Sequence, residues 1–327
     1  MASAGLICAH KLLGYLLLPI RILVILPFII ISLILIYISN LGILPKDLVY
    51  FVLVGGMKIA SVIFGLNIHV QQDKEYENYK MLPKNEKFVI VYNHINPLDI
   101  IILSNVIENY ISFVGINTLC SLFPISYICN FLDVIKINKN KRTKTTEKIN
   151  KYLQTSKHKL CIAPDECKHF DENEYIASFK TGSFANKNNV LPVVIRYIPS
   201  YKSKDFNWNA PENRDISLVQ HMKNLLLDGD IDIYVKFLDL QKYDETKYEN
   251  CNEYANDVRD KMKNELKKMP KQNESQLNKV TETNINCIFF ITFVSLIIGL
   301  VAVGLNDFER AFHMMSVAFS GFLYHSF

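Results

Sequence analysis

Residues 88–99 read Phe88-Val-Ile-Val-Tyr-Asn-His-Ile-Asn-Pro-Leu-Asp99, and this stretch decides the fold of the middle of the chain. The apolar run that ends at Tyr92 predicts a buried strand. Asn96 is a favoured helix N-cap, and Pro97 is favoured as the first helical residue, so a helix is expected to follow at once. A strand that turns directly into a helix is typical of α/β structures.

The same alternation continues along the chain. Short apolar runs predict strands, and apolar residues at helical spacing predict helices. The expected strands are 88–92, 111–114, 134–137, 160–163, 190–197 and 231–237, and the expected helices are 97–108, 145–155 and 251–268. Strands that alternate with helices predict an α/β layer structure.

The N-terminal end of the chain is strongly apolar. Residues 15–38 are long enough to cross a hydrocarbon core, which needs about 20 helical residues, and too long for the core of a signal peptide. Arg21 and Pro27 leave two interpretations open: a crossing helix in which Arg21 snorkels to the interface, or a bent helix that enters and leaves on one face. A second run, residues 48–66, carries Gly55, Gly56 and Lys58 and predicts an interfacial helix.

The C-terminal end is also apolar. Residues 287–305 contain no charged side chain, and residues 311–324 form a shorter apolar run, so the two together predict a transmembrane helical hairpin. The expected organisation is therefore N-terminal membrane-embedded or interfacial helices (1–69), a central α/β domain (70–270), a linker (271–285) and a C-terminal hairpin (286–327).

Charge and cysteine content exclude several classes of protein. The net charge is only +4, so nucleic acid is not expected as a partner. The chain has seven cysteines, an odd number without a C-x-x-C pair, which is not a disulfide framework and suits a reducing cytosolic face. The polar middle of the chain and its few apolar segments argue against a transporter or channel.

His94 and Asp99 are the candidate catalytic pair. His94 lies on the predicted turn, and Asp99 lies in the first turn of the following helix, from where its carboxylate reaches back to one imidazole nitrogen. That contact fixes the tautomer and leaves the other nitrogen as a general base. No serine nucleophile stands beside the pair, so it suits deprotonation of a bound hydroxyl that then attacks an activated carbonyl. On spacing alone, a capping Asp beside an ordinary loop His remains an alternative.

Several blocks in this order resemble the PlsC-like lysophospholipid and glycerol-phosphate acyltransferases. Asn93-His94-x-x-x-x-Asp99 is similar to the first motif of that family, residues 134–139 to the second, residues 161–166 to the third and residues 190–197 to the fourth. Residues 179–184 match the F-K-x-G-[AS]-F segment between the third and fourth motifs. Residues 18–22 and the pair Arg196-Tyr197, followed by Trp208, resemble the eukaryotic lysophosphatidylcholine and endoplasmic-reticulum glycerol-3-phosphate acyltransferase branch.

The resemblance implies a fold and a set of site residues. The expected fold is a mixed central sheet flanked by helices, as in glycerol-3-phosphate acyltransferase. His94 and Asp99 would be catalytic, and the substrate-binding residues would be Asn93, Lys139, Arg142, Asp165, Lys180 and Gly182. Two departures bear on the acceptor. Lys139 replaces the usual Arg of the second motif and lacks its bidentate fork, and Asp165-Glu166 replaces the Glu-Gly of the third.

The resemblance also implies the reaction and the partners. An acyl-CoA co-substrate would donate its acyl group to a lysophospholipid, of the lysophosphatidate, lysophosphatidylcholine or lysophosphatidylethanolamine type, at a lipid bilayer. No cofactor is expected, and the location implied is the endoplasmic reticulum membrane with the catalytic domain facing the cytosol. Glycerol-3-phosphate is the alternative acceptor, and a membrane scaffold that binds lipid without turnover is the alternative class.

One further cluster points to a different chemistry. Cys161, Asp165, Cys167 and His169 lie close together in the sequence, as metal ligands often do. Their spacing matches no familiar zinc pattern, and Cys161 is expected to face the core of a strand, so no metal is predicted.

Overall fold

The computed structural model describes most of the first 270 residues, namely 2–72, 87–107, 110–122, 125–138, 142–156, 158–165, 176–185, 187–199 and 231–270, with 217, 220–221, 223–224 and 227. The chain divides into two units, residues 1–274 and 275–327. The predicted linker (271–285) and hairpin (286–327), like Trp208, lie outside the described residues.

The first unit is built on one seven-stranded mixed sheet with the strand order β1-β7-β6-β2-β5-β3-β4. Strands β6, β2, β5, β3 and β4 are mutually parallel, whereas β7 pairs antiparallel with β6 and parallel with the edge strand β1. The strands are β1 (Leu66–Gln72), β2 (Phe88–Tyr92), β3 (Ile111–Ile116), β4 (Ile135–Ile137), β5 (Lys159–Ile162), β6 (Asn189–Pro199) and β7 (Ile231–Phe237). The predicted α/β class with a mixed sheet flanked by helices is confirmed.

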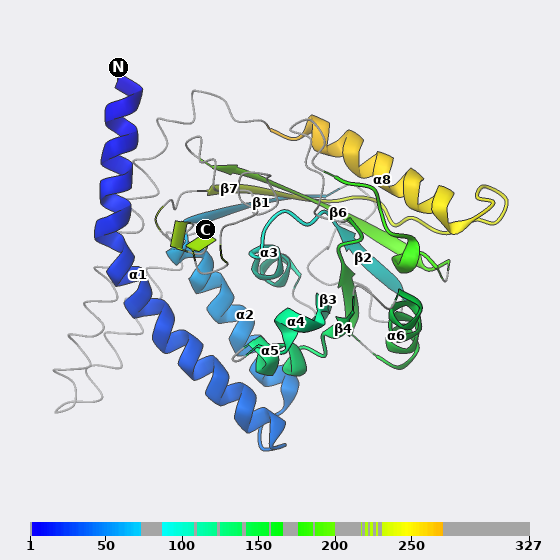
Figure 1. The fold of residues 1–327 in the computed structure, drawn as a ribbon, viewed down its shortest axis with the longest axis horizontal. Coiled ribbons are helices and arrows are strands. Elements are labelled where there is room, and N and C mark those ends of the chain that lie inside the picture. Colours follow the sequence, from blue (N-terminus) through cyan, green and yellow to red (C-terminus); the bar gives the residue numbers. More distant parts are fainter. Residues whose placement is uncertain are drawn as a thin grey trace. The chain divides into compact units, whose positions relative to one another are not determined.

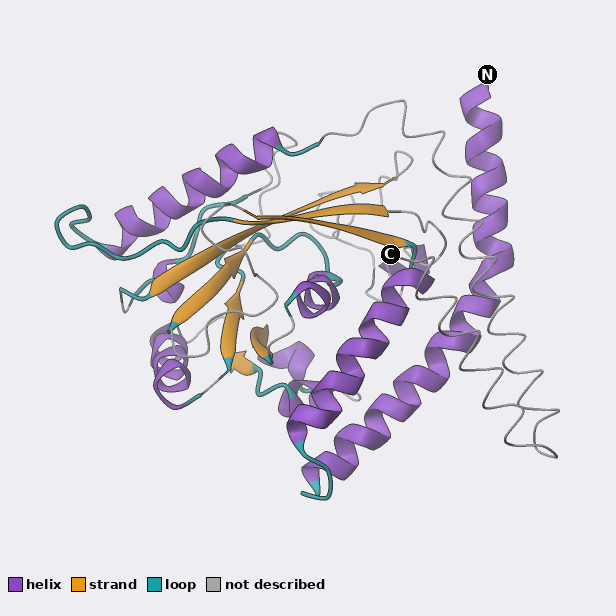
Figure 2. Ribbon diagram, turned by 180° about the vertical axis from the view of Figure 1, so that it is seen from behind, coloured by secondary structure: helices purple, strands orange, loops and turns teal. Residues whose placement is uncertain are grey.

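Helices cover both faces of this sheet. On one face, α3 (Asp99–Val106) and the end of α2 (Lys46–Ile63) pack with the strands in one apolar cluster. On the other face, α6 (Arg142–Thr155) and α8 (Cys251–Lys268) belong to a second cluster. Figures 1 and 2 show α8 and α3 on opposite sides of the sheet. The short helices α4 (Asn117–Cys120), α5 (Ile125–Phe131) and η1 (Thr181–Ser183) complete the described elements.

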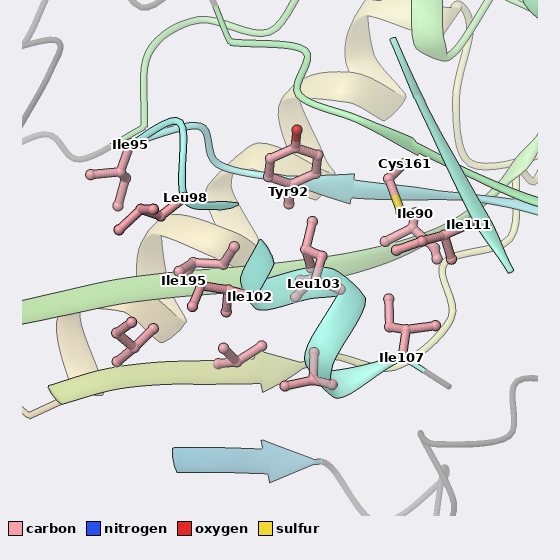
Figure 3. Packing of buried hydrophobic residues seen from close by; sticks show 14 of the residues in the cluster. Ile90, Tyr92, Ile95, Leu98, Ile102, Leu103, Ile107, Ile111, Cys161 and Ile195 are labelled. Carbon is pink, nitrogen blue, oxygen red and sulfur yellow. The ribbon is translucent and has the colours of Figure 1, made fainter. Parts of the chain in front are cut away.

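Helix α3 is held over the strand that precedes it. Its side chains Ile102 and Leu103 are fully buried, and Figure 3 shows them among Ile90, Tyr92 and Ile195. Complete burial of one such aliphatic side chain contributes roughly 1.5–3 kcal/mol. This packing fixes the start of α3, and with it Asp99, relative to the end of β2.

The local predictions that differ from the structure include the start of α3, strand β1 and the end of α2. Helix α3 begins at Asp99 rather than at Pro97, because Pro97 and Leu98 form a turn in which the Asn96 side chain accepts the Leu98 N–H. Strand β1 was not expected, since its first residue closes an apolar run that predicts a helix. The helix predicted over residues 48–66 ends earlier, at Ile63, because Gly65 adopts φ +67°. The chain then continues directly into strand β1.

The N-terminal helix α1 (Ala2–Asn40) is longer than predicted. It contains Pro19 and Pro27 without ending at either, and Figure 1 shows it bent. Within the described residues, Gly14–Asn40 is the stretch long and apolar enough to span a membrane, and 17% of its most apolar window is buried in the protein. Arg21, which snorkels to the interface in one of the two interpretations, is buried.

Helices α1 and α2 pack closely against each other. Gly56 of α2 lies under the Phe28 ring of α1, so closely that a Cβ atom at position 56 would overlap the ring. The neighbouring Gly55 has nothing within 4 Å of the corresponding point. The outer surface of the two helices exposes large apolar side chains, among them Leu16, Leu23, Ile31, Ile34, Leu48 and Phe51.

Candidate active site

The site begins at the carboxyl end of β2, where Asn93 joins two strands. Its side-chain amide donates to the Ile195 carbonyl and its side-chain oxygen accepts the Ile195 N–H, each at 2.8 Å. Asn93 is completely buried. The side chain therefore clamps the end of β2 to β6 and has no exposed atom, and the substrate contact that the resemblance implies for it stays a prediction.

His94 follows directly and is the exposed member of the predicted pair. Its Nδ1 lies 2.8 Å from Asp99 Oδ2, the contact expected from the spacing. The His94 side chain is 34% exposed, whereas that of Asp99 is 0% exposed. Asp99 contacts Nδ1, and the exposed part of the His94 side chain gives a ligand access to the ring.

The carboxylate of Asp99 is surrounded by donors. Oδ2 also accepts the backbone N–H groups of Ile95 at 2.9 Å and Asn96 at 3.2 Å, and Oδ1 accepts the Tyr197 hydroxyl at 2.5 Å. A buried charge is tolerated only when it is paired and hydrogen-bonded, and these partners meet that condition. The turn at Ile95 and Asn96 and the strand β6 thus hold the Asp99 carboxylate in place. The carboxylate in turn orients the His94 imidazole.

A second carboxylate contacts the backbone of His94. Asp165 is buried, and its two side-chain oxygens lie 3.1 and 3.3 Å from the backbone nitrogen of His94, which donates to them. Burial raises the pKa of Asp165 to about 7, although the charge and the N–H of His94 oppose that rise. Asp165 therefore supports the His94 turn in addition to any contact with an acceptor.

The two carboxylates determine the basicity of the imidazole. Burial lowers the pKa of His94, but the hydrogen bond and charge of Asp99 and the charge of Asp165 outweigh it. The net result is a pKa above the ordinary value of 6.5. A partly exposed imidazole with a raised pKa is suited to general acid–base work.

Two residues of this network have no assigned role in the sequence analysis. Tyr197 lies in the last part of β6, and the sequence singles out the pair Arg196-Tyr197 without giving Tyr197 the role that its contact with Asp99 indicates. His221 is fully buried, and its Nε2 lies 3.1 Å from Asn96 Nδ2 in the same turn. No spacing rule links either residue to His94, because each is more than 90 residues away in the chain.

The other predicted binding residues are only partly described. Lys139 lies outside the described residues, and Arg142 is the first residue of α6, with its side chain undescribed. Lys180 is exposed and follows Phe179, which forms a β-bridge with Asp165, so its backbone is close to the His94 turn. Gly182 lies in η1, where a Cβ would make only ordinary contact with Thr146. Their roles stay predictions.

The structure describes only part of the sequence cluster Cys161, Asp165, Cys167 and His169, for which no metal is predicted. Cys161 lies fully buried in β5, as expected for a core-facing strand residue, while Cys167 and His169 lie outside the described residues. Within the described part of the chain, no three His, Cys, Asp or Glu side chains are grouped as metal ligands.

The polar groups lie together at the carboxyl ends of the parallel strands. His94 follows β2, Asp165 follows β5 and Tyr197 lies in the last part of β6, and these three strands are parallel. In open α/β sheets ligands bind outside the carboxyl ends of the strands, which is where His94 is exposed. The arrangement can take a proton from a hydroxyl at Nε2 and stabilise the resulting imidazolium.

Comparisons with known proteins found similarities to acyltransferases. Among solved structures, the 1-acyl-sn-glycerophosphate (LPA) acyltransferase PlsC from Thermotoga maritima matches with a TM-score of 0.48 and 15% identity over 82% of this chain and 99% of that chain. No curated protein matches the chain. The family model described as Acyltransferase matches residues 73–196, so this segment, which contains His94, Asp99 and Asp165, carries the sequence pattern of the acyltransferase family.

Proposed function

We propose that the chain is a glycerolipid O-acyltransferase that uses acyl-CoA and a lysophospholipid. The single observation that carries the proposal is the partly exposed His94, held through Nδ1 by the buried Asp99 inside the segment that matches the acyltransferase family. The match supports acyl transfer in general. The acyl-CoA donor and the lysophospholipid acceptor go beyond the match and are proposed here.

The proposed chemistry starts at Nε2, the ring nitrogen of His94 that does not contact Asp99. Nε2 accepts the proton of the acceptor hydroxyl while the hydroxyl oxygen attacks the thioester carbonyl carbon. Asp99 stabilises the imidazolium that forms. The tetrahedral intermediate then collapses, the C–S bond breaks, and the CoA sulfur leaves with the proton from His94. The products are the acylated lipid and free CoA, and no group remains attached to the protein.

The N-terminal helices support a location at a bilayer. Helix α1 is long and apolar enough to span one, and the large apolar side chains on α1 and α2 face outward. Removing such side chains from water by burial in lipid is favourable by about 25 cal/mol per Å². We propose that these helices hold the site at the membrane surface, where both lipid substrates reside, and that the membrane is the endoplasmic reticulum with the site on its cytosolic side.

The proposed acceptor site uses cationic side chains. Lys180 is exposed directly after the bridge that joins Phe179 to Asp165. We propose that it acts with Lys139 and Arg142 to bind the acceptor phosphate, beside Gly182. Lysophosphatidate, other lysophospholipids and glycerol-3-phosphate all carry such a phosphate, so the acceptors must be separated by experiment.

The test is an acyl-transfer assay on the full-length protein in membranes. Labelled acyl-CoA is supplied with lysophosphatidate, lysophosphatidylcholine, lysophosphatidylethanolamine or glycerol-3-phosphate, and both labelled lipid and free CoA are measured. We expect acylated product with a lysophospholipid and none in His94→Ala. His69→Ala is the matched control, because His69 also contacts an aspartate, Asp232 at 3.0 Å, but on the edge pair β1–β7.

Two results would contradict the proposal. Acyl transfer by His94→Ala at the rate of the unmodified protein would exclude His94 as the base. Binding of lysophospholipid without any acylated product, from a folded and membrane-bound protein, would instead identify a lipid-binding scaffold.

A further inference from the structure

The side chain of Tyr197 reaches the predicted catalytic pair from a distant strand. It lies on β6 with its hydroxyl 2.5 Å from Asp99 Oδ1, on the oxygen that does not contact His94. Tyr197 is buried, and its ring belongs to the same apolar cluster as Tyr92 and Ile195. The packing therefore holds the hydroxyl at the carboxylate.

We propose that Tyr197 is a positioning residue that orients the Asp99 carboxylate and limits how much negative charge it presents to His94. The inference rests on the proposed function and deepens it. In this arrangement Tyr197 touches no substrate and acts only through Asp99.

The physical argument starts from the rotation of the carboxylate. The bonds from His94, Ile95 and Asn96 all fall on Oδ2 and come from one turn, so they hold one oxygen only. The bond from Tyr197 holds Oδ1 and sets the plane of the group. A donor on Oδ1 also draws charge away from Oδ2, which weakens the attraction of Asp99 for the imidazolium form of His94.

Other ionisable groups face this pair and must be considered with it. Asp165 adds negative charge near His94. Burial and the charge of Asp99 hold the pKa of Tyr197 well above its ordinary value of 10.0. Tyr92 is also close to Tyr197, and His221 contacts Asn96 in the same turn. Tyr197 thus remains the protonated donor over the range in which His94 titrates.

The experiment compares Tyr197→Phe with Tyr254→Phe in the full-length protein. Tyr254 is the matched control because it is also fully buried and its hydroxyl also donates a hydrogen bond, to the Gln241 carbonyl at 2.8 Å, but in the second apolar cluster. We measure kcat, the acceptor KM, the pH dependence of kcat and the titration of the His94 imidazole by NMR, with the resonance identified by its loss in His94→Gln.

We expect Tyr197→Phe to lower kcat about tenfold or more, equivalent to ~1.4 kcal/mol, with little change in acceptor KM. The titration of His94 and the acid limb of kcat should both move to higher pH, because Asp99 then presents more charge to the imidazole. In an Asp99→Asn background the same change should have no further effect on the His94 titration. Tyr254→Phe should leave the His94 titration where it is.

Several outcomes would overturn the inference. An unchanged His94 titration in folded Tyr197→Phe would do so, as would a shift that persists in full when Asp99 is already Asn. If Tyr197→Phe does not fold, 3,5-difluorotyrosine placed at position 197 keeps the ring volume and gives a stronger donor, and His94 must then titrate at lower pH. Since the NMR titration needs no turnover, it tests Tyr197 even if the protein transfers no acyl group.

Discussion

The two side-chain oxygens of Asp165 lie 3.1 and 3.3 Å from the backbone nitrogen of His94, although the residues are 71 positions apart in the chain. Asp165 thus reaches, from a distant part of the chain, the turn that carries the proposed base. Asp165 therefore has two candidate roles, support of His94 and contact with the acceptor. The two roles predict different effects of substitution on kcat and on the acceptor KM.

The first prediction concerns Asp165→Asn. The amide oxygen can still accept the His94 N–H, but the negative charge that Asp165 gains as it ionises near pH 7, and that helps to raise the pKa of His94, is lost. We expect the acid limb of kcat to move to lower pH with the acceptor KM unchanged. A large rise in acceptor KM with no movement of the pH profile would assign Asp165 to the acceptor instead.

The second prediction concerns stability against pH. The folded protein holds a proton on Asp165 up to about pH 7, whereas the unfolded chain releases it near the ordinary value of 3.8. Because the folded state binds more protons between these values, its unfolding free energy falls as the pH rises through that window, by on the order of a few kcal/mol. Denaturant unfolding of Asp165→Asn should show a flatter dependence between pH 4 and 7, and an equal slope in both proteins would refute this.

The third prediction compares two histidines that each contact an aspartate. His94→Ala should lower the acyl-transfer rate by about 10²–10⁴-fold, the usual contribution of a general base, with little loss of stability. His69→Ala should retain the full rate, because the His69–Asp232 pair lies on the edge pair of strands and His69 is half exposed. Equal losses in the two variants, measured on matched amounts of folded protein, would argue against a specific role for His94.

The fourth prediction concerns the clamp between β2 and β6. Asn93→Ala leaves the N–H and carbonyl of Ile195 buried without their side-chain partner, so we expect a loss of ~2–4 kcal/mol in unfolding free energy. Asn250→Ala is the control, since it removes the N-cap of α8, whose oxygen accepts two exposed N–H groups, and should cost about 1 kcal/mol. A smaller loss for Asn93→Ala than for Asn250→Ala would show that the clamp is unimportant.

The fifth prediction uses two adjacent glycines of α2. Gly55→Ala adds a methyl group in open space and should stabilise the helix by about 0.5–1 kcal/mol. Gly56→Ala should destabilise by ~1–2 kcal/mol, because its methyl group displaces the Phe28 ring of α1. Thermal unfolding in detergent measures both. The same sign of change in the two variants would mean that α1 does not pack on α2 at this point.

Much of the fold was predictable because its elements are local. Strands β2 and β7 and helix α8 have the bounds that their apolar patterns predict, since burial on one or both faces leaves a direct record in the sequence. The edge strand β1 was missed because its first residue continues the apolar run of α2. The start of α3 was misplaced by two residues because the Asn96 side chain forms a turn there rather than a cap.

The sequence by itself determined the contact between His94 and Asp99, because both residues belong to one strand–turn–helix segment whose local geometry leaves the carboxylate beside the imidazole. Only the tertiary structure decided which groups support that pair. Tyr197 reaches Asp99 across 98 positions, Asp165 reaches His94 across 71, and Asn93 clamps Ile195 across 102. Each of these contacts depends on the order in which parallel strands are placed in the sheet, and strand order is set by packing of the whole core rather than by any local pattern.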